Sequence, residues 1–285
     1  MGNCDSCPSK GTCQTKKEDC NGVESSKLQP RFGRIKNVIG VISGKGGVGK
    51  STVTGIMAAM LAKRGYKVGV LDADITGPSM PRVLGINEKR AGIVPINDEV
   101  VRFDPVETDC GIKVISMNLV NPVEEEPLIW RGGIINGVLK QIFVDTNWGE
   151  LDYLLIDMPP GTGDIALTVM QEFPINELVI VSTPQDMVSM IVKKVVIMAN
   201  KIGVKIKGVV ENMAYINCPD CDKKIRVFSN KSSEENAEYL GIPLIGELPI
   251  DINLTDALAQ GKLEEYVKED PLYSLIFLYL IHISE

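Results

Sequence analysis

The chain has 285 residues, of which 44% are apolar, so it can bury the core of one large α/β domain or of two small ones. Its formal net charge of -7 argues against broad nucleic-acid binding, which needs a basic face to neutralise phosphates. No apolar run reaches the roughly 18 residues of a membrane-spanning helix, and the polar N-terminus has no signal-peptide core. We therefore expect a cytoplasmic protein that has neither nucleic acid nor a membrane as a partner.

Cysteine-rich sequence marks the start of the chain. Seven cysteines without an export signal favour metal ligation or catalysis over structural disulfides. Residues 1–33 hold four of the seven and few large apolar side chains, so this segment cannot build a core of its own. The sequence predicts a metal-binding tail and linker over residues 1–33 and one domain over residues 34–285.

From Ile35 onward, apolar runs rich in β-branched residues alternate with helical patterns. This alternation predicts an α/β fold, with a mostly parallel sheet flanked by helices on both faces. Strands are expected at residues 36–42, 67–71, 153–156, 178–181, 206–210 and 243–245. Helices are expected at residues 50–64, 133–144, 164–172, 187–202, 232–240 and 254–260, with Gly65 and Gly203 as helix stops. A hairpin is expected within residues 93–117, and the apolar pattern at 272–283 indicates a docking helix or a dimer contact.

A nucleotide-binding motif follows the first predicted strand. Residues 44–51 match G-x-x-x-x-G-K-[ST], and the helical pattern begins at Lys50. Backbone N–H groups of such a loop surround phosphates where bulkier residues would obstruct the approach. We expect Lys50 to contact the β- and γ-phosphates of ATP, the Ser51 hydroxyl to ligate Mg²⁺, and Thr52 to lie near the α-phosphate. The predicted nucleotide-binding residues are Gly46, Gly47, Val48, Gly49, Lys50, Ser51 and Thr52. The alternative is a glycine-rich turn without a ligand.

Carboxylates stand at the ends of two predicted strands. Ligands of open α/β sheets gather at the carboxyl ends of strands, where such side chains can face Mg²⁺ and the attacking water. We expect Asp157 to hold Mg²⁺ through water and Asp74 to position the hydrolytic water. Asp72 is read as a carboxylate that closes a strand. For Asp164, a helix N-cap is favoured over a ligand role.

The residues from Lys45 to Thr52 resemble the deviant Walker A motif of the MinD, ParA and nitrogenase iron-protein superfamily, the SIMIBI type of P-loop NTPase. The resemblance implies that Lys45 crosses a dimer interface. A second positive charge at the γ-phosphate, delivered by the partner, would make charge stabilisation depend on dimerisation, as an arginine finger does. The alternative is a solvated loop lysine.

A narrower resemblance covers about residues 36–261. The segments 74–81 and 157–164, and Glu211-Asn212-Met213 followed by a Cys-x-x-Cys pair, resemble the Mrp/ApbC/Nbp-type family of iron–sulfur cluster carrier ATPases. This implies a homodimer that hydrolyses ATP slowly, holds a [4Fe–4S] cluster and passes it to apoproteins. The implied partners are these apoproteins and cluster-assembly factors. It also places Asn212 at the adenine base, with the turn from Pro249 to Asp251 nearby. From its type alone, Asn212 could equally be an ordinary turn residue.

The second cysteine motif, Cys218 and Cys221, supplies two thiolates. A symmetric homodimer would bring two copies together and complete four ligands for a bridging [4Fe–4S] cluster, as the family resemblance also implies. Zinc binding and a redox-active Cys-x-x-Cys remain alternatives. Cys110, which stands alone in a predicted β segment, is read as structural.

The tail supplies four potential cluster ligands within one chain, and it resembles the ferredoxin-like N-terminal extension of the Nbp-type subgroup. In that subgroup a distant cysteine precedes the Cys-x2-Cys-x5-Cys unit, whereas here the outlying cysteine follows it, so ligation by Cys20 stays open. The candidate tail ligands are Cys4, Cys7, Cys13 and Cys20.

Two other functions fit the same nucleotide motif. One is a positioning ATPase of the MinD or ParA kind, against which the acidic composition and the missing basic terminal helix count. The other is an ATP-gated electron donor that resembles the nitrogenase iron protein.

Overall fold

The computed structural model of the chain describes residues 27–75, 77–121, 132–218, 220–221 and 223–276. The four tail cysteines therefore lie outside the described residues, as does the second half of the predicted C-terminal helix at 272–283. In the part of the chain that is described, no helix combines the length and the apolar character needed to cross a bilayer.

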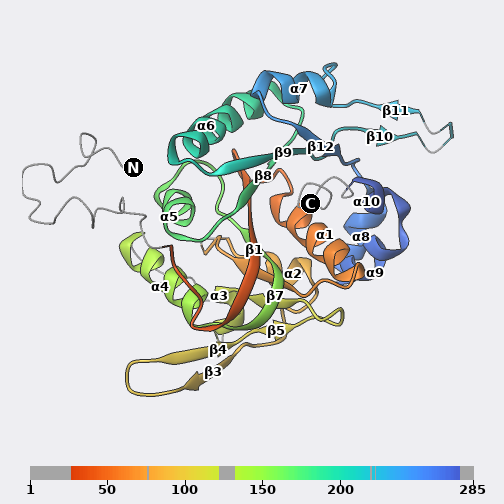
Figure 1. Cartoon of the computed structure of the whole chain (residues 1–285). Helices are drawn as coiled ribbons and strands as arrows, with labels where there is room; N and C mark the ends of the chain where they lie inside the picture. Colours follow the sequence, from red (N-terminus) through yellow and green to blue (C-terminus); the bar gives the residue numbers. More distant parts are fainter. Residues whose placement is uncertain (1–26, 76, 122–131, 219, 222, 277–285) are drawn as a thin grey trace, which may run out of the picture.

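An eight-stranded sheet forms the centre of the molecule, in the order β12-β9-β8-β1-β7-β2-β6-β5 (Figure 1). Neighbouring strands run parallel, except that β5 is antiparallel to β6. The predicted mostly parallel sheet is confirmed. The strands are β1 (Phe32–Ser43), β2 (Val68–Asp72), β5 (Val106–Glu107), β6 (Lys113–Ile115), β7 (Asn147–Asp157), β8 (Glu177–Ser182), β9 (Lys205–Glu211) and β12 (Leu244–Glu247).

Helices cover both faces of the sheet, as predicted (Figure 1). Because both faces are covered, the inner parts of the central strands are continuous buried runs without alternation: the last six residues of β1 and all of β2 are buried. On one face lie α1 (Lys50–Lys63), α2 (Met80–Val83), α8 (Ile252–Ala259), α9 (Leu263–Glu269) and α10 (Pro271–Ile276). On the other lie α4 (Gly132–Asp145), α5 (Asp164–Glu172) and α6 (Asp186–Ile202), with α7 (Ser233–Leu240) against α6. A short α3 (Met117–Val120) follows β6.

The six predicted strands and six predicted helices are all present, with most ends shifted by one or two residues. The largest shift is at β7, which begins at Asn147 because its polar first residues pair with the start of β1. Gly65 and Gly203 adopt left-handed φ values of 85° and 84° just after α1 and α6, as expected of helix stops.

The predicted hairpin within residues 93–117 is also confirmed. Strands β3 (Gly92–Pro95) and β4 (Val101–Asp104) form an antiparallel pair outside the main sheet. The Asn97 side chain accepts hydrogen bonds from the backbone N–H groups of Glu99 and Val100, at 2.9 and 2.8 Å. These side-chain bonds to nearby backbone are what make asparagine a turn former here.

Two local predictions are wrong. Asp164 does not cap α5: it is the first helical residue, the N-cap is Gly163, and no side chain caps this end. Cys110 does not lie in a strand, because Gly111, at φ 77°, turns the chain between β5 and β6. The half-buried Cys110 thiol lies 2.5 Å from Lys268 Nζ on α9, and burial raises its pKa.

Candidate nucleotide and cysteine sites

The phosphate-binding loop connects the buried end of β1 to the start of α1. Gly47 and Gly49 have φ values of 79° and 78°, which residues with a Cβ rarely adopt. A Cβ at Gly46 or Gly47 would meet nothing within 4 Å, so the loop backbone faces open space there. The loop ends at the N-terminus of a 14-residue helix, where N–H groups and the helix dipole favour anions.

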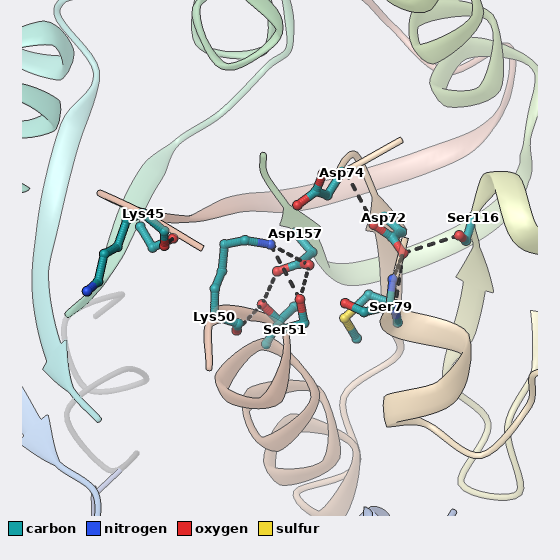
Figure 2. A network of polar contacts seen from close by, with 11 residues as sticks. Lys45, Lys50, Ser51, Asp72, Asp74, Ser79, Ser116 and Asp157 are labelled. Carbon is teal, nitrogen blue, oxygen red and sulfur yellow. Dashed lines mark hydrogen bonds and ion pairs between the residues drawn. The ribbon is translucent and has the colours of Figure 1, made fainter. Parts of the chain in front are cut away.

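Asp157 gathers the charged and hydroxyl groups of the first turns of α1. Its Oδ2 accepts hydrogen bonds from Lys50 Nζ and Ser51 Oγ, each at 2.6 Å, and its Oδ1 accepts one from Thr54 Oγ1 at 2.8 Å (Figure 2). The Asp157 side chain is fully buried and that of Lys50 is 7% exposed. The fold therefore brings the predicted lysine, Mg²⁺-ligating hydroxyl and carboxylate together at the end of β7. Sequence reasoning missed Thr54, although it lies one helical turn from Lys50 on the same face.

Asp72 has a larger structural role than the sequence indicates, because it does more than close a strand. Its Oδ2 accepts hydrogen bonds from the backbone N–H groups of Ser79 and Met80 and from the Ser116 hydroxyl, at 3.0 to 3.2 Å. Its Oδ1 accepts one from the Asp74 N–H at 3.2 Å (Figure 2). The carboxylate thus holds both ends of the loop that carries Asp74. Burial, reinforced by the charge of Asp157 opposite it in the sheet, raises the pKa of Asp72 from 3.8 to about 7.

Replacement of Asp72 by Asn is expected to change how stability depends on pH. With a pKa raised in the folded state, Asp72 stabilises the fold below about pH 4, and this contribution is lost as the pH rises to about 7. Asn cannot ionise, so relative to wild type the variant should gain up to about 1.4 kcal/mol per pH unit across that window. Urea unfolding at pH 4.5, 6 and 7.5 measures the difference. A difference that does not vary with pH would contradict the assignment.

Lys45 lies in the same loop but faces another way. Its Nζ donates a hydrogen bond to Gln185 Oε1 at 3.0 Å, and Figure 2 shows its side chain turned away from Lys50 and Asp157. Gln185, which holds it, immediately precedes α6 and was not singled out from the sequence.

Asn212 reaches the phosphate-binding loop from the end of β9. Its Nδ2 donates a hydrogen bond to the Val48 carbonyl at 2.9 Å, and a Cβ at Gly49 would lie 2.2 Å from that nitrogen. Gly49 is therefore required for close approach as well as for its φ value. Asn212 is 8% exposed, and its own N–H bonds to the Ser182 carbonyl at 2.8 Å.

Pro249 is buried beyond β12, and Asp251 begins α8. Asp251 Oδ1 accepts hydrogen bonds from the N–H groups of Asn253 and Leu254 at 2.9 and 3.2 Å, so it caps the helix. Its Oδ2 accepts bonds from the hydroxyls of Tyr266 and Tyr273, at 2.7 and 2.8 Å. Burial and the Asp251 charge raise the pKa of both tyrosines. The Asp251 side chain thus ties three C-terminal helices together. The position of this turn beside adenine stays a prediction.

The change Asp251→Ala is expected to lower the free energy of unfolding by about 3 kcal/mol, because the helix loses its cap and the hydroxyls of buried Tyr273 and half-buried Tyr266 lose the Asp251 acceptor. Urea unfolding followed by circular dichroism measures it. The matched control is Asp256→Ala, an exposed residue of the same helix. Equal effects of the two changes would show that Asp251 is no anchor.

The Cys-x-x-Cys pair lies at the tip of a second hairpin. Strands β10 (Ile216–Asn217) and β11 (Lys224–Ile225) pair antiparallel, and the Cys218 N–H bonds to the Lys223 carbonyl at 3.0 Å. Figure 1 shows this hairpin projecting from the sheet beside α7. Cys218 is half-buried and Cys221 exposed. Hydrogen bonds to the Cys218 sulfur, first from the Asp220 backbone and then from the Cys221 thiol, lower the pKa of Cys218.

The hairpin offers two sulfur ligands that lie within hydrogen-bonding reach of each other. Among the described residues, no group of three or more His, Cys, Asp or Glu side chains could hold a metal ion. A tetrahedral sulfur site requires four ligands, so the described part of one copy presents half of such a site.

Comparisons with known proteins agree with this geometry. Residues 34–277 match the family model described as ParA, NUBPL iron-transfer P-loop NTPase. The iron-sulfur cluster carrier protein of Clostridium perfringens is 69% identical over 281 residues, which cover 97% of this chain and 99% of the relative. The carrier protein of Methanocaldococcus jannaschii is 42% identical over 261 residues, covering 91% and 88%.

Solved structures show the same architecture. A nucleotide-binding protein from Archaeoglobus fulgidus, in complex with ADP and with cobalt, superposes with a TM-score of 0.69 at 43% identity, covering 81% of this chain and 89% of that one. The cell-division ATPase MinD of Pyrococcus furiosus, at 22% identity and a TM-score of 0.60, covers 87% and 99% and shares the fold. The fold, the phosphate-binding loop and these matches together show that the chain belongs to the ParA-type NUBPL iron-transfer family of P-loop NTPases.

Proposed function

We propose that two copies of this chain hold a [4Fe–4S] cluster between them through Cys218 and Cys221, and pass it to apoproteins in a cycle that depends on ATP. The observation that carries the proposal is the hairpin tip, where two thiols lie together and backbone N–H groups favour the thiolate of Cys218. A two-fold axis beside this tip would complete four thiolates. A reducing environment keeps such thiols free of disulfides, and the cytosol is the compartment that fits this use.

In the same proposal, ATP binds at the open glycine loop. Its phosphates accept hydrogen bonds from the loop N–H groups, and Lys50 turns from Asp157 toward the β- and γ-phosphates. The freed Ser51 hydroxyl and Asp157, the latter through water, are the groups that would hold Mg²⁺. These hard oxygen donors suit Mg²⁺, whereas the two sulfurs suit iron.

Hydrolysis needs an oriented water and charge stabilisation at the γ-phosphate. Asp74, on the loop that Asp72 fixes, would orient the water, and Lys45 of a second copy would supply the additional charge. Dimer closure would then depend on bound ATP, and the affinity for the cluster would differ between the open and closed dimers. Slow hydrolysis would reset the dimer, and the clients would be apoproteins that require a [4Fe–4S] cluster. The likeness to MinD supports the fold and gives no reason to prefer a positioning role.

Anaerobic reconstitution tests the proposal. A full-length variant with serine at the four tail cysteines should bind about four iron and four sulfide per dimer, because only the bridging site remains. Its reduced form should give an electron paramagnetic resonance signal of a [4Fe–4S] cluster, and it should activate an apo-enzyme that requires one. A zinc-loaded protein that binds no iron after reconstitution would refute the proposal.

A further inference from the structure

Two neighbouring glutamates, the buried Glu211 and the half-buried Glu247, connect the cysteine hairpin to the sheet. Glu211 and Glu247 end β9 and β12 and are partners in the parallel register. Glu247 accepts hydrogen bonds from Lys224 Nζ at 2.6 Å, from Arg226 Nη2 at 3.1 Å and from the Ser233 hydroxyl at 2.8 Å. Lys224 and Arg226 belong to the returning arm of the hairpin, so one carboxylate anchors that arm to the sheet.

The second carboxylate, that of Glu211, has a hydrogen-bond partner at only one of its two oxygens among the described residues. Glu211 is 2% exposed, and its Oε1 accepts a hydrogen bond from Asn236 Nδ2 at 2.7 Å. Its Oε2 is buried without a hydrogen-bond partner among the described residues, and so is Arg226 Nη1. Burial raises the pKa of Glu211 and the charge of Glu247 acts in the same direction, while Ser233, Asn236 and the charge of Arg226 oppose that shift. A buried acceptor and a buried donor of opposite charge therefore stand unsatisfied in one cluster, which costs stability unless another arrangement pairs them.

Glu211 is connected to the phosphate-binding loop through its neighbour in the chain. The next residue, Asn212, donates its side-chain hydrogen bond to the Val48 carbonyl. The Glu211 carbonyl accepts a hydrogen bond from the Leu248 N–H at 2.8 Å, which fixes β9 against the end of β12. A change in the position of the loop or of Asn212 when ATP binds would therefore move the end of β9 that carries the Glu211 carboxylate.

We propose that Arg226 is a positioning residue that couples the nucleotide site to the cysteine hairpin, by pairing with Glu247 alone in one state and with both Glu247 and Glu211 in the other. A guanidinium suits this role because its planar fork can bond two carboxylates at once. The second state would draw the returning arm of the hairpin toward β9 and reorient Cys218 and Cys221. The inference rests on the proposed function in that ATP binds the glycine loop, and it requires no cluster.

Thiol accessibility in the reduced, cluster-free, full-length protein tests this coupling. Iodoacetamide labels the cysteines with and without saturating Mg-ATP, and mass spectrometry of the peptide with Cys218 and Cys221 gives the rate. We expect ATP to change the wild-type rate by about fivefold or more, the lower end of ordinary allosteric coupling, and by less than about twofold in Arg226→Lys and in Glu211→Gln. Lysine keeps the charge beside Glu247 but lacks the second fork arm, and glutamine keeps the size and the acceptor for Asn236.

The control is Lys223→Gln, an exposed charge in the same turn, which should keep the wild-type response to ATP. Combining Arg226→Lys with Glu211→Gln should reduce the response no further than either change alone, as for two halves of one contact. A wild-type rate indifferent to ATP, a full response in either variant, or additive effects in the double variant would each overturn the inference. Cluster binding is measured separately, so a protein that responds to ATP but binds no iron would contradict the proposed function and leave this coupling intact.

Discussion

The joint change of Cys218 and Cys221 to serine is expected to abolish cluster transfer. A hydroxyl is a poor ligand for iron compared with a thiolate, and two such changes per chain remove all four ligands of the proposed shared site. Changes outside the ligand set of metal sites cost 10- to 100-fold in affinity, so loss of the ligands themselves should lower transfer to an apo-enzyme by more than about 100-fold. The measurement is apo-enzyme activation after anaerobic reconstitution, with ATP affinity determined in parallel.

Cys110 provides the matched control, because it is a half-buried cysteine in the turn between β5 and β6 and contacts Lys268. Cys110→Ser should leave transfer unchanged. The double variant should still bind ATP, since the hairpin tip contributes no group to the Asp157 cluster. Wild-type transfer by the double variant would exclude the hairpin as the carrier site.

The central sheet could be predicted because its signals are local. Strands buried on both faces read as continuous apolar runs, and the glycine loop with its lysine and hydroxyl lies within one short segment. Both the apolar runs and the glycine loop can be recognised without knowledge of the rest of the chain. The Cys-x-x-Cys pair was found for the same reason, whereas the β10–β11 hairpin that carries it was not predicted.

Contacts between distant segments could not be predicted in this way. The Asp72 carboxylate accepts hydrogen bonds from two segments, seven to eight and 44 residues further along the chain. Asp251 meets tyrosines 15 and 22 residues away. Neither arrangement leaves a spacing motif in the sequence. Asp164 shows the limit of local rules. Its residue type suits a helix N-cap, but the helix begins at Asp164 itself and the N-cap is Gly163.

The other large effect is expected at Lys45. Lys45→Ala should lower ATP hydrolysis by about 10³-fold or more, the range found when an arginine finger is removed, while ATP still binds. Binding should persist because Lys45 contacts Gln185 and takes no part in the cluster of Lys50, Ser51 and Asp157. The measurement is phosphate release at saturating Mg-ATP, with nucleotide affinity measured by fluorescence titration. Undiminished hydrolysis would make Lys45 a solvated loop lysine.

Mixed dimers decide whether Lys45 acts in its own subunit or in the partner. Homodimers of Lys45→Ala and of Asp74→Ala should both be inactive. If Lys45 acts across the interface, a dimer with one subunit of each kind has one complete site, formed by Asp74 of the first subunit and Lys45 of the second. It should then hydrolyse ATP at about half of the wild-type rate, because one of two symmetric sites is intact. If Lys45 acts within its own subunit, each site of the mixed dimer lacks one essential group, and the mixed dimer is as inactive as the two homodimers. That result would remove the reason for ATP to close the dimer around a shared cluster.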